Sequence, residues 1–136
     1  MRPLRQAEIA GLLADDAVAH LATLDPAGYP HITPIWFLWD GSAFRLTSRP
    51  GRPHVRRIHA NPRVGLVVDR ELDRRGGRRP NRQIRILGDA ELATDHNGQW
   101  TARIREKYLR VDADPPPVDR TLITISPTVF LALAGS

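Results

Sequence analysis

The residues that could bind a charged ligand are concentrated in one stretch, Thr47 to Pro62, which reads TSRPGRPHVRRIHANP. Its first half holds two prolines and a glycine, which predicts a tight turn. Pro53 suits the first turn of a helix, because its missing N–H has no intrahelical partner there. Free N–H groups at a helix start are suited to phosphate. Four basic side chains lie near the predicted helix start: Arg49, Arg52, His54 and Arg56. The alternative is a basic, solvated connector.

A short helix over His54 to His59 is predicted to follow the turn and to end before Pro62. Val55, Ile58 and His59 are expected on its buried side. His54 and His59 are five positions apart, so they do not share one helical face. The histidines show no spacing typical of metal ligands, and no Ser-His-Asp or Cys-His set is evident. We therefore predict no metal site.

The chain has 136 residues, enough for a buried core, and we treat residues 1–136 as a single domain. It has no cysteine, which excludes disulfides and thiolate metal sites. No apolar run approaches the ~20 residues of a membrane span. Acidic residues interrupt the apolar part of the N-terminal MRPLRQAEIAGLLADD, which argues against a signal peptide. We expect a cytoplasmic protein.

The net charge of +5 comes from 20 basic and 15 acidic residues, and Lys107 is the only lysine. Arginine binds planar oxyanions through paired hydrogen bonds, so nucleic acid is a legitimate rival partner. Against it, the aromatic residues are few and lie in apolar, strand-like runs rather than between basic residues.

Alternating apolar positions and turn residues predict six or so strands with mostly local connections. The strands are expected at Ala17–Leu24, Tyr29–Trp39, Ala43–Ser48, Arg63–Asp69, Arg82–Ala93 and Thr121–Leu133. The other expected elements are helices at Arg5–Ala14 and Asn97–Leu109, an exposed loop at Glu71–Pro80 and a proline-rich link at Asp112–Pro117. This pattern favours a closed antiparallel barrel with two or three peripheral helices.

A few residues should disturb these strands. Pro30 and Pro34 would be awkward in a central strand, which suggests a bulge or an edge position. Gly88 interrupts an alternating run and predicts a kink or bulge. Pro127 should bend the last strand. His20, in the first apolar run, is interpreted as a structural histidine with its hydrogen bonds satisfied.

Four segments together resemble the split-barrel flavoprotein superfamily, which includes pyridoxamine 5′-phosphate oxidases and actinobacterial flavin/deazaflavin-dependent oxidoreductases. AHLATLDPAGYPHITPIWFLWDG resembles the opening hairpin of that family. FRLTSRPGRPHVRRIHANPRVGLVV resembles its strand, phosphate turn, helix and next strand. NRQIRILGDAEL is similar to its Arg-Gln strand, and REKY with TLITISPTVF resembles the closing helix and strand. The resemblance covers about Val18 to Phe130.

The resemblance implies a mainly β (α+β) fold, a six-stranded antiparallel split β-barrel with two or three peripheral helices. It implies a homodimer with a cofactor, FMN or the deazaflavin coenzyme F-420, in each of two clefts at the subunit interface. The strand Thr33–Leu38 would then run along the isoalloxazine ring, mainly through its backbone. The positions that match cofactor-binding residues of the family are Pro34, Ile35, Trp36 and Phe37 along the ring, Leu46 and Thr47 near the ribityl chain and phosphate, Arg52, Pro53 and His54 on the phosphate turn, and Gln83.

The chain departs from the family pattern at the phosphate turn. His54 stands where the family usually has lysine, Arg57 where it often has asparagine, and Pro53 where pyridoxamine phosphate oxidases have arginine. Because the reference pKa of histidine is ~6.5, we expect Arg52 to be the main phosphate cation, helped by Thr47 and by helix N–H groups. The C-terminal substrate segment of true pyridoxamine phosphate oxidases has no counterpart here, so that activity is not expected.

These features predict a flavin- or deazaflavin-dependent oxidoreductase that transfers hydride to or from an unidentified small organic substrate, with the cofactor performing the chemistry. Trp36, Phe37 and Trp39 could stack on a ring, although aromatic residues in strands are more often plain core. The arginines of Arg70–Arg82 could hold the oligoglutamate tail of a deazaflavin, or form a solvated hairpin end. The alternative function is a non-catalytic module that binds a cofactor, haem or nucleic acid.

Overall fold

The computed structural model describes residues 1–74, 76–111, 116 and 118–135. Nearly half of them belong to antiparallel strands, and helices flank the sheet. The elements in chain order are β1 (Arg2–Pro3), α1 (Gln6–Ala14), β2 (Ala19–Leu24), β3 (Pro30–Ile35), β4 (Leu38–Trp39), β5 (Phe44–Ser48), α2 (Pro53–Ala60), β6 (Arg63–Glu71), β7 (Asn81–Asp95), a 3-10 turn (His96–Gly98), α3 (Gln99–Leu109) and β8 (Arg120–Gly135).

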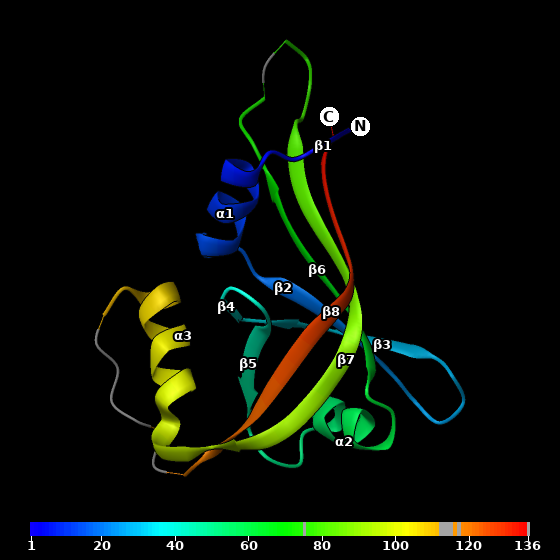
Figure 1. The fold of residues 1–136 in the computed structure, drawn as a ribbon, viewed down its shortest axis with the longest axis vertical. Helices are drawn as coiled ribbons and strands as arrows, with labels where there is room; N and C mark the ends of the chain where they lie inside the picture. Colours follow the sequence, from blue (N-terminus) through cyan, green and yellow to red (C-terminus); the bar gives the residue numbers. More distant parts are fainter. Residues whose placement is uncertain (75, 112–115, 117, 136) are drawn as a thin grey trace.

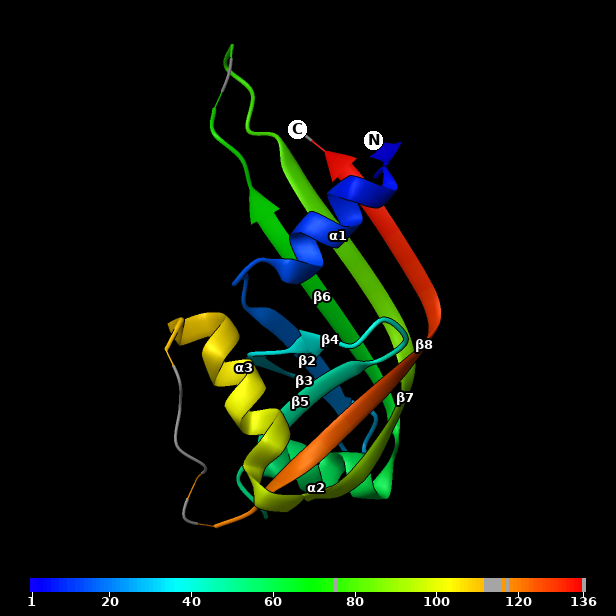
Figure 2. The same cartoon turned by 60° about the vertical axis from the view of Figure 1, so that its left-hand side comes forward.

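The described strands form one antiparallel sheet in the order β3-β2-β6-β7-β8-β5-β4, with β1 paired to the end of β8. The long strands β7 and β8 run side by side along most of the length of the molecule (Figure 1). α2 lies at one end of the sheet, whereas α1 and α3 lie beside it, as Figure 2 shows. The predicted fold class, a mainly antiparallel β structure with peripheral helices, is confirmed.

The sheet is open, because β3 and β4 are not paired with each other in the described part of the chain. The predicted strand Tyr29–Trp39 is therefore two strands, separated at Trp36 and Phe37. Phe37 turns its ring into the core, where its exposed fraction is 0%. Its N–H donates to the hydroxyl of Tyr108 (3.2 Å) instead of to a neighbouring strand. A helix thus occupies the gap that a closed barrel would seal with a strand pair.

A β-bulge bends the two longest strands at the same place. Leu87 pairs with Val129 but Gly88 pairs with Pro127, so Thr128 is an extra residue in β8. A Cβ atom at position 88 would clash with the carbonyl oxygen of Ser126. The kinks predicted at Gly88 and Pro127 are therefore one structural feature. Pro30 and Pro34 lie in β3, the edge strand, as predicted.

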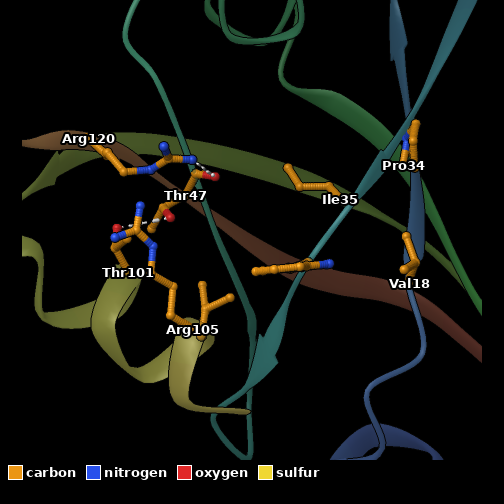
Figure 3. A pocket seen from close by; sticks show the side chains of 9 residues that line it. Val18, Pro34, Ile35, Thr47, Thr101, Arg105 and Arg120 are labelled. Atoms are coloured by element: carbon orange, nitrogen blue, oxygen red, sulfur yellow. Dashed lines mark hydrogen bonds between the residues drawn. The ribbon is translucent and has the colours of Figure 1, made fainter. Parts of the chain in front are cut away.

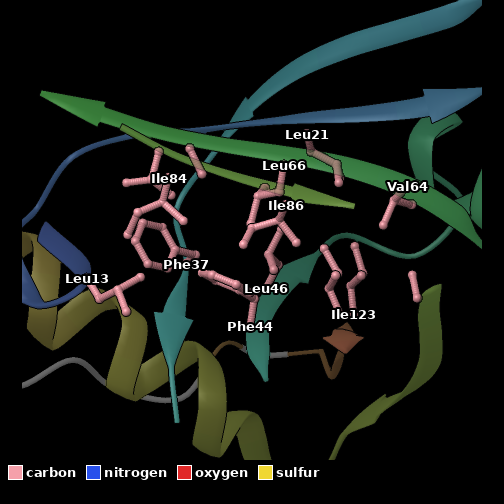
Figure 4. Packing of buried hydrophobic residues seen from close by; sticks show 14 of the residues in the cluster. Leu13, Leu21, Phe37, Phe44, Leu46, Val64, Leu66, Ile84, Ile86 and Ile123 are labelled. Atoms are coloured by element: carbon pink, nitrogen blue, oxygen red, sulfur yellow. The ribbon is translucent and has the colours of Figure 1, made fainter. Parts of the chain in front are cut away.

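The core lies on the inner face of the curved sheet, where side chains from five strands meet the aromatic rings of the β4–β5 region (Figure 4). Its fully buried members include Leu21, Phe37, Phe44, Leu46, Leu66, Ile84, Ile123 and Ile125. Along β2, β6 and β7 these residues alternate with exposed ones, which is the period of a strand with one buried face.

Two predictions about histidines are wrong. In β2 the buried residues are Ala19, Leu21 and Thr23, so the alternation of the strand turns His20 to the outer face, where it is exposed. In α2 the buried side consists of Val55 and Ile58 (8% and 2% exposed), and His59 is exposed.

The described residues of the loop between β6 and β7, 72–74 and 76–80, lie at the opposite end of the molecule from α2 (Figures 1 and 2). The proline-rich link predicted at Asp112–Pro117 falls largely outside the described residues. None of the described helices is long and apolar enough to cross a membrane.

Candidate functional site

A cleft opens between the edge strand β3, strand β5 and the helices α2 and α3 (Figure 3). It has two adjoining parts of about 510 Å³ and 520 Å³. Each volume lies within the usual range for small-molecule sites. Four residues line both parts and join them into one cleft: Pro34, Ile35, Thr47 and Arg120.

The first part is largely apolar, with Val18, Ile35 and Ile104 in its lining. Its aromatic wall is Trp36, whose exposed fraction is 39%. The ring of Trp36 stacks on that of Tyr108, with centroids 4.7 Å apart. This part could therefore hold a planar ring system against an aromatic surface.

Lys107, the neighbour of Tyr108, attaches α3 to the rest of the molecule. Its Nζ donates to the carbonyl oxygens of Leu13 (3.1 Å) and Phe37 (3.0 Å) and lies 3.6 Å from the centroid of the Phe37 ring. Burial lowers the pKa of Lys107 to about 8. Together with the Tyr108 hydroxyl, which donates to Ala17 O (2.8 Å), this ammonium fixes the end of α3 behind the cleft.

The second part of the cleft is cationic. Its lining includes Arg49, Arg52, His54, Arg57 and Arg120. As predicted, α2 begins at Pro53, directly after the turn that contains Arg52. No acidic side chain lines this part, among the residues that the structure describes. Such an arrangement suits an anion that accepts several hydrogen bonds, such as a phosphate.

Two buried nitrogens in this cationic part lack a protein partner. Among the described residues, His54 Nε2 and Arg120 Nε are buried without a hydrogen bond. Burial, followed by the charges of Arg57 and Arg52, lowers the pKa of His54. Burial is also the main cause that lowers the pKa of Arg120. Because buried polar groups normally have partners, these two atoms fit a ligand that supplies the missing hydrogen-bond partners.

A buried polar cluster lies where the two parts of the cleft meet. The hydroxyl oxygens of Thr47 and Thr101 are 3.0 Å apart, and Thr101 Oγ1 lies 2.7 Å from Asp95 Oδ2. Arg120 Nη2 donates to the carbonyl oxygen of Thr47 (3.1 Å), as Figure 3 shows. The cluster connects β5, the end of β7, the start of α3 and the start of β8.

The structure brings together seven of the ten residues predicted to bind the cofactor. Pro34, Ile35, Trp36, Thr47, Arg52, Pro53 and His54 line the cleft. Phe37 and Leu46 do not, because their side chains lie in the core at 0% exposure. Gln83 lies on β7, where its side chain bonds Asn81 and Arg85. Cofactor contacts by any of the ten residues stay predictions.

Sequence reasoning missed the contribution of α3. Thr101, Ile104 and Arg105 line the cleft, and with Tyr108 they occupy positions i, i+3, i+4 and i+7 of one helical face. That spacing was visible, but it does not tell which site the face covers. Arg120 was missed because it begins β8, far from the phosphate turn in the chain.

A split antiparallel barrel with a cleft between its edge strand and two helices defines the class of this protein. The chain belongs to the family described as pyridoxamine 5′-phosphate oxidase, whose model matches residues 6–133. A solved structure of an F420 reductase is 32% identical, with 88% of this chain and 93% of that one covered and a TM-score of 0.72.

Two further solved structures share the fold. A FAD-binding protein from Mesorhizobium loti is 21% identical, with 99% of this chain and 96% of that one covered and a TM-score of 0.70. A conserved hypothetical protein from Mycobacterium tuberculosis is 20% identical, with 95% and 84% covered and a TM-score of 0.75. No curated protein matches the sequence.

Proposed function

We propose that this protein is an oxidoreductase that binds a flavin or deazaflavin, FMN or coenzyme F-420, in the cleft and transfers hydride to or from a small organic substrate. One observation carries the proposal: an aromatic-walled, mainly apolar space, bordered by Arg105 and Arg120, adjoins a space lined by four arginines and His54. A phosphorylated heterocycle has both matching groups: a planar ring for the first space and an anionic phosphate for the second. The likeness to an F420 reductase supports the same assignment.

Each part of the cleft has a role in this proposal. Trp36 provides a flat surface for the ring system, and Tyr108 keeps Trp36 in place. β3 is an edge strand, so alternate residues present unpaired backbone groups that can bind the polar edge of the ring. Arg52, Arg120 and the start of α2 neutralise the phosphate. The ring system supplies the hydride-transfer chemistry when it is bound.

The proposal includes a homodimer. A hollow on the outer face of the sheet presents mainly apolar side chains, Ala22, Ile32, Val67, Leu87, Val129 and Leu131, together with His20 and Arg85. Ile32 and Leu87 are 68% and 58% exposed. Exposed patches of this kind mark protein interfaces.

A second copy of the chain is the occupant that we infer for this hollow. β3 carries Ile32 in the hollow and Thr33, Pro34 and Ile35 in the cleft, so a partner seated there would border the cofactor. Trp39 does not need cover from a partner, because it packs against Phe44 and Phe130 within its own protomer.

The second candidate function is a module that binds the cofactor without turnover. Its support is His54, which stands where a fixed lysine charge is usual and whose pKa is lowered by burial. We also considered that the arginines of Arg70–Arg82 hold the oligoglutamate tail of a deazaflavin. This hypothesis gains no support within one protomer, because the described residues of the β6–β7 loop lie at the end of the molecule opposite to α2 (Figures 1 and 2).

Steady-state reduction of quinone acceptors by the reduced cofactor separates the two functions. Turnover that scales with protein concentration supports the oxidoreductase. Cofactor binding without turnover, across a range of acceptors, supports the module. If neither FMN nor coenzyme F-420 changes its spectrum or fluorescence on mixing with the protein, both candidates are wrong.

A further inference from the structure

A buried chain of hydrogen bonds runs from Asp95 to the wall of the cleft. Asp95, Thr101 and Thr47 are only 1%, 3% and 8% exposed. Thr101 Oγ1 lies 2.7 Å from Asp95 Oδ2 and 3.0 Å from Thr47 Oγ1. Thr47 is the outermost member, and it lines both parts of the cleft at their junction.

Within this row of hydrogen bonds, Asp95 can only act as an acceptor. Its Oδ1 accepts the backbone N–H of Trp100 (3.0 Å), and its Oδ2 accepts that of Thr101 (2.9 Å). Both N–H groups belong to the first turn of α3, where the helix dipole favours a negative charge. An ionised carboxylate has no hydrogen to give. The Thr101 hydroxyl must therefore donate to Asp95.

The direction of the remaining bond follows from the single hydrogen of each hydroxyl group. Thr101 uses its hydrogen on Asp95, so it accepts from Thr47. Thr47 then has only oxygen lone pairs left for the cleft. We propose that Asp95, acting through Thr101, fixes Thr47 as a hydrogen-bond acceptor in the cleft, so that a ligand group that bonds Thr47 must be a hydrogen-bond donor.

This inference rests on the proposed function and specifies which part of the cofactor bonds Thr47. Thr47 lies between the apolar and the cationic part, so the matching donor belongs to the segment that joins ring and phosphate. A hydroxylated chain, such as the ribityl chain of a flavin or deazaflavin, has the required chemistry. In this arrangement Thr47 has no hydrogen left to donate to the phosphate, and the part in phosphate binding that the sequence suggests for it stays a prediction. Thr47 is a binding residue, and Asp95 and Thr101 are positioning residues.

The test compares Thr47→Val with wild type, using riboflavin and an analogue whose chain hydroxyls are O-methylated. The analogue keeps its oxygen acceptors but has no hydroxyl donors. Thr47→Val should weaken riboflavin binding about threefold to tenfold and leave binding of the analogue unchanged. Thr47→Ser, which keeps the hydroxyl, should bind both ligands like wild type. Equal weakening of both ligands, or no weakening of riboflavin, would overturn the inference.

A ligand-free measurement keeps the inference separate from the proposed function. If Thr101 donates to Asp95, its hydroxyl proton should exchange slowly with water, as seen by proton NMR, in wild type and in Thr47→Val alike. If Thr47→Val releases that proton to fast exchange, Thr101 was donating to Thr47 and the assigned direction is wrong. Failure of wild type to bind any flavin would count against the proposed function and leave this result intact.

Discussion

The ring of Trp36 lies against the ring of Tyr108, with their centroids 4.7 Å apart and their planes within 4° of parallel. Trp36 follows the edge strand of the sheet, and Tyr108 lies near the end of α3. The Tyr108 hydroxyl also accepts the Phe37 N–H and donates to the Ala17 carbonyl. Tyr108 therefore holds the aromatic wall through its ring and two backbone segments, at Phe37 and at Ala17, through its hydroxyl group.

Tyr108→Phe should reduce stability without moving the aromatic wall. It leaves the Phe37 N–H and the Ala17 carbonyl without a protein partner, which should cost about 1–3 kcal/mol of unfolding free energy in urea titrations. The stacked ring remains, so cofactor affinity should change little. Tyr108→Leu removes the ring as well and should weaken cofactor binding. If Tyr108→Phe unfolds like wild type, the hydroxyl does not have this structural role.

Lys107 should make the protein more stable as pH rises above about 8. Burial lowers its pKa in the folded protein from 10.5 to about 8. Between these values the unfolded chain binds more protons than the folded one, so the unfolding free energy rises with pH. Lys107→Met cannot titrate and should lack this rise. Parallel stability curves for the two proteins, up to the pH where tyrosines begin to ionise, would contradict the prediction.

Gly88→Ala should destabilise the protein more than Gly65→Ala. A Cβ at position 88 clashes with the carbonyl oxygen of Ser126, whereas one at position 65 makes an ordinary contact with Ala22 Cβ at 3.7 Å. Overpacking of this kind typically costs about 1–3 kcal/mol. Thermal unfolding of both variants measures the difference. Equal stabilities would mean that the bulge adapts at no cost.

The protein should be a dimer in solution, and Leu87→Glu should make it monomeric. Leu87 lies in the apolar hollow and is 58% exposed, so a buried charge there would oppose association. Leu109→Glu is the control, because Leu109 is similarly exposed (51%) but lies at the end of α3, outside the hollow. Sedimentation equilibrium reports the masses. A monomeric wild type at micromolar concentration would rule out this interface.

Local features of the fold were predictable because nearby residues determine them. Pro53 marks the start of α2, and the alternation around Gly88 marks a strand with a bulge. The turn before α2 was predictable for the same reason, since its prolines, glycine and arginines are close in the chain.

Features that join distant segments were not predictable. The helical spacing of Trp100, Ile104 and Tyr108 indicates a covered face but not what covers it. Asp95 looks in the sequence like an ordinary acid at a strand end, yet it is buried and organises Thr101. The break between β3 and β4 depends on Phe37 entering the core, and no local pattern separates it from its neighbours in an apolar run.

The proposed cofactor site depends on Arg52, which we expect to bind the phosphate of FMN or coenzyme F-420 in the cleft. The direct test titrates FMN and coenzyme F-420 into wild type, Arg52→Ala and Arg56→Ala and follows fluorescence. Arg56 is exposed on α2, just after the turn that contains Arg52, and does not line the cleft, among the described residues, so it controls for net charge. We predict that wild type binds one of the two cofactors. Arg52→Ala should bind it about ten- to a hundredfold more weakly, because charge-assisted hydrogen bonds are strong, and Arg56→Ala should match wild type. Equal affinity of Arg52→Ala and wild type, or no binding by wild type, would contradict the claim.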